Sequence, residues 1–123
     1  MYKSQKVTSQ IEQCTVDYAF QRIGGKYKAR ILWHLFDGTK RYGELKRHLP
    51  DITPKMLTQA LRELEADALI KRRVYLEVPP RVEYSLDNSG RELVPAIELL
   101  SGWAKVQMEK HSIPIMAYEH NAC

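Results

Sequence analysis

Residues 52–64 read Ile52-Thr53-Pro54-Lys55-Met56-Leu57-Thr58-Gln59-Ala60-Leu61-Arg62-Glu63-Leu64, and this stretch decides the fold of the chain. Threonine is a preferred N-cap residue and proline suits the first helical position, so Thr53-Pro54 predicts a helix start. Ile52 and Leu57 flank this start at the spacing of a hydrophobic staple. The apolar side chains at helical spacing are Leu57, Leu61 and Leu64. The stretch therefore predicts a helix over about 54–66 that packs against a core.

The opposite face of this helix carries hydrogen-bonding side chains, none of them acidic: Lys55, Thr58, Gln59 and Arg62. Glutamine matches the edge of adenine, arginine matches guanine or a phosphate, and threonine can contact the methyl group of thymine. Backbone N–H groups at the helix start suit a phosphate. These residue types favour insertion of the helix into the major groove of DNA. A plain solvated amphipathic helix is the alternative that they leave open.

The segments on either side complete a recognisable arrangement. A shorter helix is expected at about 42–49, and Pro50-Asp51 ends it just before the helix described above. Two segments rich in Val, Tyr and Leu follow, and Pro79-Pro80 between them predicts a β-hairpin. We therefore expect a helix-turn-helix at about 42–67 and a wing at about 70–87. The predicted fold class is mainly α with a small β-hairpin (α+β), a winged helix-turn-helix with flanking dimerisation helices.

The predicted wing carries its own basic residues. Arg73 lies near the base of the hairpin and Arg81 beside its tip. Arginines of a wing contact phosphates or enter a narrow minor groove. Charges that protect an edge strand from aggregation are the alternative. The candidate DNA-binding residues are then Thr53, Lys55, Thr58, Gln59, Arg62, Arg73 and Arg81.

The charge of the chain is unevenly distributed. Its 123 residues hold 19 Lys and Arg against 15 Asp and Glu, a net charge of +4. Residues 22–73 hold 13 basic against 6 acidic residues, a net +7, whereas residues 74–123 hold 4 against 7, a net −3. The positive charge thus coincides with the helix-turn-helix and the base of the hairpin. This favours a polyanion partner such as double-stranded DNA.

Length and composition exclude several classes of protein. The length predicts a single winged-helix domain over 1–123. A hydrophobic content of 44% excludes a disordered chain, and no apolar run is long enough for a membrane span. The first residues are polar and do not form a signal peptide, so we expect a cytoplasmic protein.

Two flanking helices are expected at about 15–23 and 90–110, the second opened by a capping box of Ser89 and Glu92. Their apolar side chains are Val16, Phe20 and Ile23 in the first and Leu93, Ile97 and Leu100 in the second. This is more apolar surface than one winged helix covers, so both are predicted to be dimerisation helices. Packing of both helices on their own core is the alternative. A two-fold homodimer would place two recognition helices roughly 34 Å apart on a near-palindromic operator.

Several ordered segments resemble those of one known family. They are Ile23-Gly24-Gly25-Lys26, Arg41-Tyr42-Gly43-Glu44-Leu45, Ile52-Thr53-Pro54-Lys55-Met56-Leu57-Thr58, Leu61-Arg62-Glu63-Leu64-Glu65 and Val78-Pro79-Pro80-Arg81-Val82-Glu83-Tyr84-Ser85-Leu86, with Gly90 and Trp103. From Cys14 to Trp103 the chain resembles the HxlR-type transcription regulators, a branch of the MarR-like winged-helix proteins. The resemblance implies a homodimeric, DNA-binding regulator whose outer helices form the dimer interface. It also matches Cys14 to the cysteine near the N-terminus that senses oxidants or electrophiles in some members, which makes Cys14 the redox-sensing candidate. The chain departs from the family at Thr15, Tyr27 and Ala68, where Pro, Trp and Gly are usual. The departure at Thr15, directly after Cys14, weakens the inference that Cys14 is a sensor.

The two cysteines are too few for a disulfide framework. Cys14 precedes a predicted helix start, where the helix dipole favours negative charge and so a reactive thiol, although Asp17 opposes this. A buried, inert cysteine is the alternative. Cys123 is the last residue and lies three positions after His120. That pair, even with Glu119, offers too few ligands to predict a metal site.

No motif of the sequence predicts catalysis. It contains no Gly-rich phosphate loop and no nucleophile elbow, so we expect no enzyme activity, no cofactor and no metal. The expected function is that of a sequence-specific DNA-binding transcription regulator. A regulator that responds to a small molecule without thiol sensing is one alternative. A winged-helix module for protein interaction is another. The residues do not identify the inducer.

Overall fold

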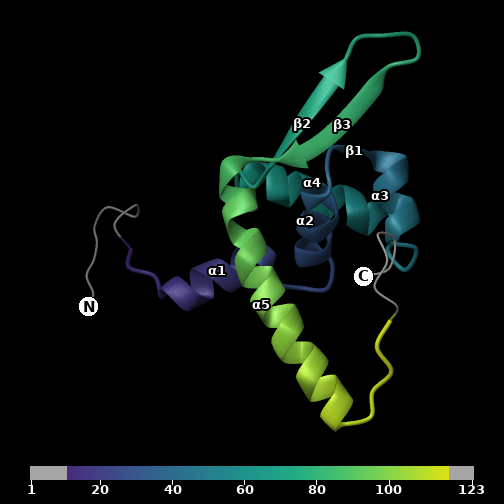
Figure 1. The fold of residues 1–123 in the computed structure, drawn as a ribbon. Coiled ribbons are helices and arrows are strands. Elements are labelled where there is room, and N and C mark those ends of the chain that lie inside the picture. The colour runs from purple at the N-terminus through teal and green to yellow at the C-terminus, as the bar shows by residue number, and fades with distance from the viewer. Residues whose placement is uncertain (1–10, 117–123) are drawn as a thin grey trace.

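The computed structural model describes residues 11–116. Its elements follow the order α1 (Thr15–Ile23), α2 (Lys28–Phe36), β1 (Lys40–Arg41), α3 (Tyr42–His48), α4 (Pro54–Ala66), β2 (Ile70–Tyr75), β3 (Arg81–Leu86) and α5 (Asn88–Lys110). Helices α2, α3 and α4 form a compact body (Figure 1). The β2–β3 hairpin projects from one end of this body, and the C-terminal part of α5 projects from the other. This is a winged helix-turn-helix, mainly helical with a small sheet, as the sequence predicts.

The core of this body is aliphatic. Helix α2 contributes Ile31, Leu32 and Leu35, all buried, to the middle of the cluster. Leu57, Leu61 and Leu64 of α4 are almost fully buried, which confirms the predicted inward face. Burial of a leucine side chain is worth about 1.5–3 kcal/mol. The inner face of α4 is therefore firmly seated, and its opposite face is left to solvent.

The start of α4 has the cap that its sequence predicts. The hydroxyl oxygen of Thr53 accepts a hydrogen bond from the backbone N–H of Met56 at 3.2 Å, and Pro54 is the first helical residue. Ile52, just outside the helix, is buried like Leu57. The hydroxyl of Tyr42 in α3 also donates to the carbonyl oxygen of Pro54 at 3.1 Å. Side chains from both helices of the motif therefore define where α4 begins.

The sheet has three antiparallel strands in the order β1-β3-β2. In the hairpin, Ile70 pairs with Leu86 at the base and Tyr75 with Arg81 towards the tip. At the base, both Ile70 and Leu86 are buried against the helical body. Leu76 and Val78, beyond the last pair, are fully exposed at the tip. The hairpin is thus anchored at its base and free at its end.

Helix α5 begins earlier than predicted. Its N-cap is Asp87, whose Oδ1 accepts from the N–H of Asn88 at 2.8 Å, so the predicted start near Gly90 with a Ser89–Glu92 capping box is wrong. Gly90 instead lies inside the first turn, where a Cβ atom would stand 2.1 Å from the carbonyl oxygen of Leu69. The first turn of α5 thus places a residue without a side chain at this close approach. Within the described residues no helix is long and apolar enough to span a membrane.

Helix α4 ends in a Schellman motif with an unusual residue. The N–H of Leu69 donates to the carbonyl of Leu64 at 3.0 Å, and that of Ala68 donates to the carbonyl of Glu65 at 3.0 Å. Ala68 consequently has φ +60°, the left-handed conformation that favours glycine. This conformation costs an L-residue about 1–2 kcal/mol. The chain therefore carries backbone strain at the turn between α4 and the hairpin.

Replacing Ala68 by glycine should stabilise the protein. The relief of left-handed strain exceeds the larger entropy of an unfolded glycine, leaving a net gain of about 0.5–1 kcal/mol. Urea unfolding of A68G against the parent measures it. The matched control, A96G at an exposed position inside α5, should lower the free energy of unfolding by about 1 kcal/mol. A destabilised A68G would contradict the strain.

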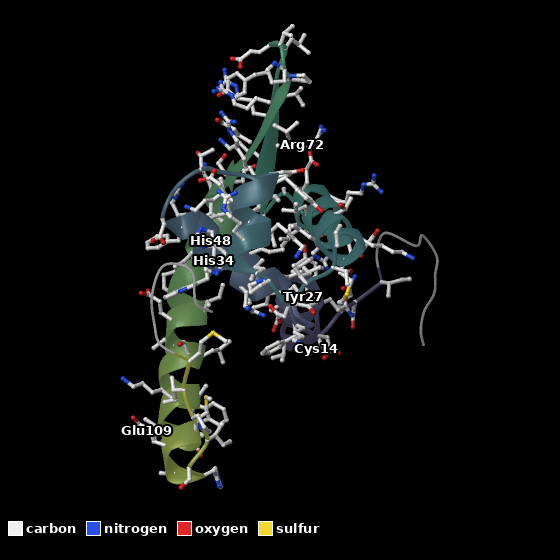
Figure 2. All side chains as sticks on the ribbon, turned by 90° about the vertical axis from the view of Figure 1, so that its right-hand side faces the viewer. Cys14, Tyr27, His34, His48, Arg72 and Glu109 are labelled. Atoms are coloured by element: carbon white, nitrogen blue, oxygen red, sulfur yellow. The ribbon has the colours of Figure 1, made fainter. Side chains whose placement is uncertain are left out.

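Two histidines stack between α2 and α3. The rings of His34 and His48 have centroids 4.9 Å apart at an interplanar angle of 12°, and they lie next to each other in Figure 2. His34 is 2% exposed. Burial lowers the pKa of His48 below its ordinary value, and the nearby Lys40 and Arg47 lower it further while Glu44 and Asp37 oppose them. The folded protein therefore favours the neutral form of His48.

Stability should fall as the pH drops below about 6.5, the ordinary histidine pKa. The pKa of His48 is lower in the folded than in the unfolded protein, so its neutral form stabilises the fold. This stabilisation is complete above the pKa of the unfolded state and is lost as the pH falls through the pKa of the folded state. Melting curves at pH 7.5 and 5.5 should show a smaller loss for H48Q than for the parent. H111Q, which removes an exposed histidine at the end of α5, controls for general effects of losing one histidine. Equal losses in H48Q and the parent would contradict the assignment.

Candidate nucleic-acid interface

The outward face of α4 presents most of the predicted reading residues to solvent. Lys55, Gln59 and Arg62 are exposed, and Thr58 is half-buried. Within residues 11–116 no acidic side chain forms an ion pair with Lys55 or Arg62. Two cationic groups therefore flank a neutral amide on one helix face. This arrangement suits hydrogen bonding to base edges and phosphates.

Thr53 has a different place from the other predicted residues. Its side-chain oxygen is occupied by the cap hydrogen bond from Met56. It therefore stabilises the helix start and holds the first turn, whose N–H groups face outward along the helix axis. Any contact of this region with a phosphate would come through those backbone groups.

Gln59 belongs to a chain of polar contacts that leads back to α2. Its Nε2 donates to Oε2 of Glu63 at 2.7 Å, and the other carboxylate oxygen of Glu63 lies 2.6 Å from Nζ of Lys28. The hydrogen bond from Lys28, and then that from Gln59, hold the pKa of Glu63 below its usual range. Sequence reasoning missed Glu63 as part of the site. The i, i+4 spacing of Gln59 and Glu63 was a signal for one contact, but nothing local pointed to Lys28.

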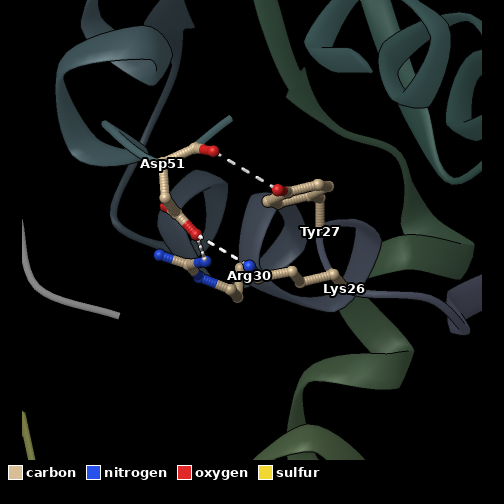
Figure 3. A network of polar contacts seen from close by, with 4 residues as sticks. All are labelled: Lys26, Tyr27, Arg30 and Asp51. Atoms are coloured by element: carbon tan, nitrogen blue, oxygen red, sulfur yellow. Dashed lines mark hydrogen bonds and ion pairs between the residues drawn. The ribbon is translucent and has the colours of Figure 1, made fainter. Parts of the chain in front are cut away.

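The turn before α4 is tied to the N-terminal end of α2 (Figure 3). Nη1 of Arg30 lies 2.9 Å from Oδ2 of Asp51, and Nζ of Lys26 lies 3.7 Å from the same oxygen. The hydroxyl of Tyr27 donates to the backbone carbonyl of Asp51 at 3.3 Å. The hydrogen bond from Arg30 is the main cause that lowers the pKa of Asp51. Asp51 is thereby an anion at neutral pH that fixes the entry to α4.

The two predicted wing residues are in different environments. Arg81 is half-buried, with its guanidinium 3.4 Å from Glu77 and 3.5 Å from Glu83, and it lies over the ring of Tyr75 at 3.9 Å. Arg73 is exposed and covers the same ring at 4.9 Å. Arg81 therefore stiffens the hairpin through its own acids. Of these two predicted residues, Arg73 is the one that presents an accessible charge.

The structure refines the charge distribution read from the sequence. Four of the basic residues at 22–73 are engaged by acids: Arg22 with Asp67, Lys28 with Glu63, and Lys26 and Arg30 with Asp51. Among the described residues no ion pair involves the exposed Lys71, Arg72 or Arg73. The other basic residues at 22–73 form no ion pair within the described part of the chain. They lie on β1 and α3 (Lys40, Arg41, Lys46 and Arg47), on α4 (Lys55 and Arg62) and on β2 (Lys71, Arg72 and Arg73), where Figure 2 labels Arg72.

Cys14 is an exposed thiol at the N-cap position of α1. Its side chain makes no cap hydrogen bond, and its backbone is extended. The alternative of a buried, inert cysteine does not hold for the single chain. Cys123, together with His120 and Glu119, lies outside the described residues. In the described part, no group of three or more candidate ligands could hold a metal ion.

Helices α1 and α5 expose a large apolar surface. Ile23 is the buried residue of α1, whereas Val16 and Phe20 are exposed. In α5, Val94 and Ile97 are buried, but further along Leu99 is 77% and Trp103 is 65% exposed. The alternative that both helices pack entirely on their own core is therefore wrong. In Figure 1 both elements extend away from the helical body.

Comparison with known proteins agrees with this architecture. The model of the HxlR-like helix-turn-helix family matches residues 22–112. The HTH-type transcriptional regulator YtcD of Bacillus subtilis (strain 168) is 54% identical over 89 residues, which are 72% of this chain and 71% of that protein. The redox regulator HypR in its oxidized form is 46% identical with a TM-score of 0.72, over 76% of this chain and 96% of that chain.

A MarR-family transcriptional regulator from Porphyromonas gingivalis W83 is also similar in structure. It is 39% identical with a TM-score of 0.73, and the match covers 82% of this chain and 97% of that chain. The family model covers most of the chain, and the identity to these regulators lies well above what the family assignment requires. The chain belongs to the HxlR-like helix-turn-helix family and is a transcriptional regulator, not an enzyme.

Proposed function

We propose that the chain is a single winged-helix domain that binds a near-palindromic operator in double-stranded DNA as a homodimer. The observation that carries this proposal is the outward face of α4, where Lys55, Gln59 and Arg62 are exposed while the inner face is seated on α2. Arg62 and Gln59 supply base-edge contacts, with Thr58 beside them. Lys55 and the capped start of α4 at Thr53 supply phosphate contacts.

The wing supports the same mode of binding. Arg73 is accessible and lies on the strand that also carries the exposed Lys71 and Arg72. We assign it to the phosphate backbone beside the groove that α4 occupies. Arg81 approaches DNA only if it leaves Glu77 or Glu83, so its contribution is mainly to hold the hairpin in shape.

The apolar surfaces of α1 and α5 support the homodimer. Phe20, Leu99 and Trp103 are large apolar side chains that the single chain leaves exposed to water, and several such side chains on two helices favour a protein interface. A second copy of the chain, related by a two-fold axis, covers the same surface on both subunits. Two α4 helices then lie roughly one DNA turn, 34 Å, apart.

Removal of Arg62 should weaken specific DNA binding. After selection of a site from randomised duplexes, R62A should lose about 1–3 kcal/mol of affinity for it, whereas R73A should weaken all sequences alike and flatten the salt dependence. Titrations at several salt concentrations measure both, and sedimentation should give two chains per duplex. K110A, at the far end of α5, is the matched control. Equal affinities of R62A and K110A would contradict the docking mode.

We further propose that the regulator responds to oxidants or electrophiles through Cys14. The exposure of this thiol at the start of α1, next to an apolar surface assigned to the dimer, supports the proposal. The similarity to HypR, described as a redox regulator, supports it as well. Modification of Cys14 would alter how α1 packs in the dimer and so change the spacing of the two reading helices.

Treatment with the thiol oxidant diamide should change the affinity for the selected DNA at least several-fold, and dithiothreitol should reverse the change. C14S should bind DNA with the affinity of the parent, and diamide should not change that affinity because the variant lacks the sulfur that is oxidised. C123S serves as the control for the second cysteine. An unchanged wild-type affinity, or an equal response of C14S, would remove the sensing role and leave DNA binding intact.

A further inference from the structure

The exposed amide of Gln59 is not free to rotate as the side chain of an isolated helix would be. Its Nε2 donates to Oε2 of Glu63 at 2.7 Å. Glu63 is in turn held from α2, because its Oε1 lies 2.6 Å from Nζ of Lys28. The side chain of Lys28 is 15% exposed and that of Glu63 is 43% exposed, so the pair lies at the edge of the packed surface between α2 and α4. The relay Lys28–Glu63–Gln59 therefore connects the reading face of α4 to the neighbouring helix.

The chemistry of the relay sets which end of the amide points where. Two hydrogen bonds lower the pKa of Glu63, so at neutral pH it is a carboxylate and accepts hydrogen bonds only. The nitrogen of the Gln59 amide must then face Glu63, and its carbonyl oxygen Oε1 must face away. One hydrogen of the NH₂ group is used by Glu63, while the other hydrogen and Oε1 remain available to a base.

We propose that Glu63 is a positioning residue that fixes the amide of Gln59 and thereby makes adenine the preferred base at the position that Gln59 reads. Adenine offers the N7 acceptor and the N6 donor in the major groove, which match one N–H and one C=O of glutamine. Guanine offers two acceptors, N7 and O6, so the fixed carbonyl oxygen of Gln59 would oppose O6. The inference rests on the proposed function, since it deepens the DNA recognition assigned to α4.

The relay also sets the size of the expected effect. A glutamine without such a hydrogen bond populates several rotamers and both amide orientations. Loss of the contact with Glu63 therefore lowers the fraction of molecules whose Gln59 can bind adenine by roughly three- to tenfold. The affinity for the adenine-containing site falls in proportion to that fraction. Affinity for unrelated DNA does not depend on the orientation of one amide, because phosphate contacts dominate it.

The test uses the full chain and selection from duplexes with a randomised core. Q59A identifies the position that Gln59 reads, because preference is lost there. In E63Q the new amide can donate to or accept from Gln59, so the orientation is no longer unique. E65Q is the matched control, since it removes the same charge from an exposed position of the same helix. Melting curves verify that each variant is folded.

We expect wild type and E65Q to select adenine at the Q59A-sensitive position. E63Q should lose roughly three- to tenfold of that preference there and nowhere else. Retention of the preference in E63Q, loss spread equally over all positions, or no sensitive position in Q59A would overturn the role of Glu63. A wild-type chain that selects no consensus would overturn the proposed function and this inference together.

Discussion

Helix α2 holds α4 at its entry, along its inner face and at its middle turn, and the reading surface depends on this attachment. At the entry, Arg30 binds the carboxylate of Asp51. Along the helix, three leucines of α4 pack into the aliphatic core cluster to which α2 also contributes. On the middle turn, Lys28 binds Glu63. With α4 held in these ways, its outer face has a definite direction relative to the hairpin and to α5.

The two kinds of contact have different roles. A buried leucine is worth about 1.5–3 kcal/mol, whereas an exposed ion pair contributes roughly 0–1 kcal/mol. The leucines therefore stabilise the packing of α4, and the polar pairs add little stability. What the pairs add is orientation, because a hydrogen bond to an anion specifies direction as apolar contact does not. Asp51 orients the turn before α4, and Glu63 orients a side chain on its outer face.

The wing and the flanking helices show the same division between anchored and exposed parts. The base of the hairpin is buried, while Arg81, Tyr75 and two glutamates stiffen it further out. Helix α5 is fixed at its first turn by the close approach of Gly90 to Leu69. Its later turns carry exposed apolar residues such as Trp103. A rigid body with exposed apolar flanks matches the homodimer that we propose for this member of the HxlR-like family.

The sequence alone determined the helix-turn-helix, the hairpin after it and the two flanking helices, together with the start of α4 and its inward face. These depend on neighbours along the chain: the cap of Thr53-Pro54, the spacing of three leucines, and two prolines between strands. The predicted start of α5 is two residues late because Asp87 and Ser89 are both good caps and the sequence does not choose between them. The tertiary structure decided which charged groups pair. It brings Lys28 to Glu63 and Arg81 to two glutamates, and it pairs four basic residues at 22–73 with acids. The distance between the two groups of such a pair depends on how the helices and strands pack against one another. The spacing of residues along the sequence does not predict this distance.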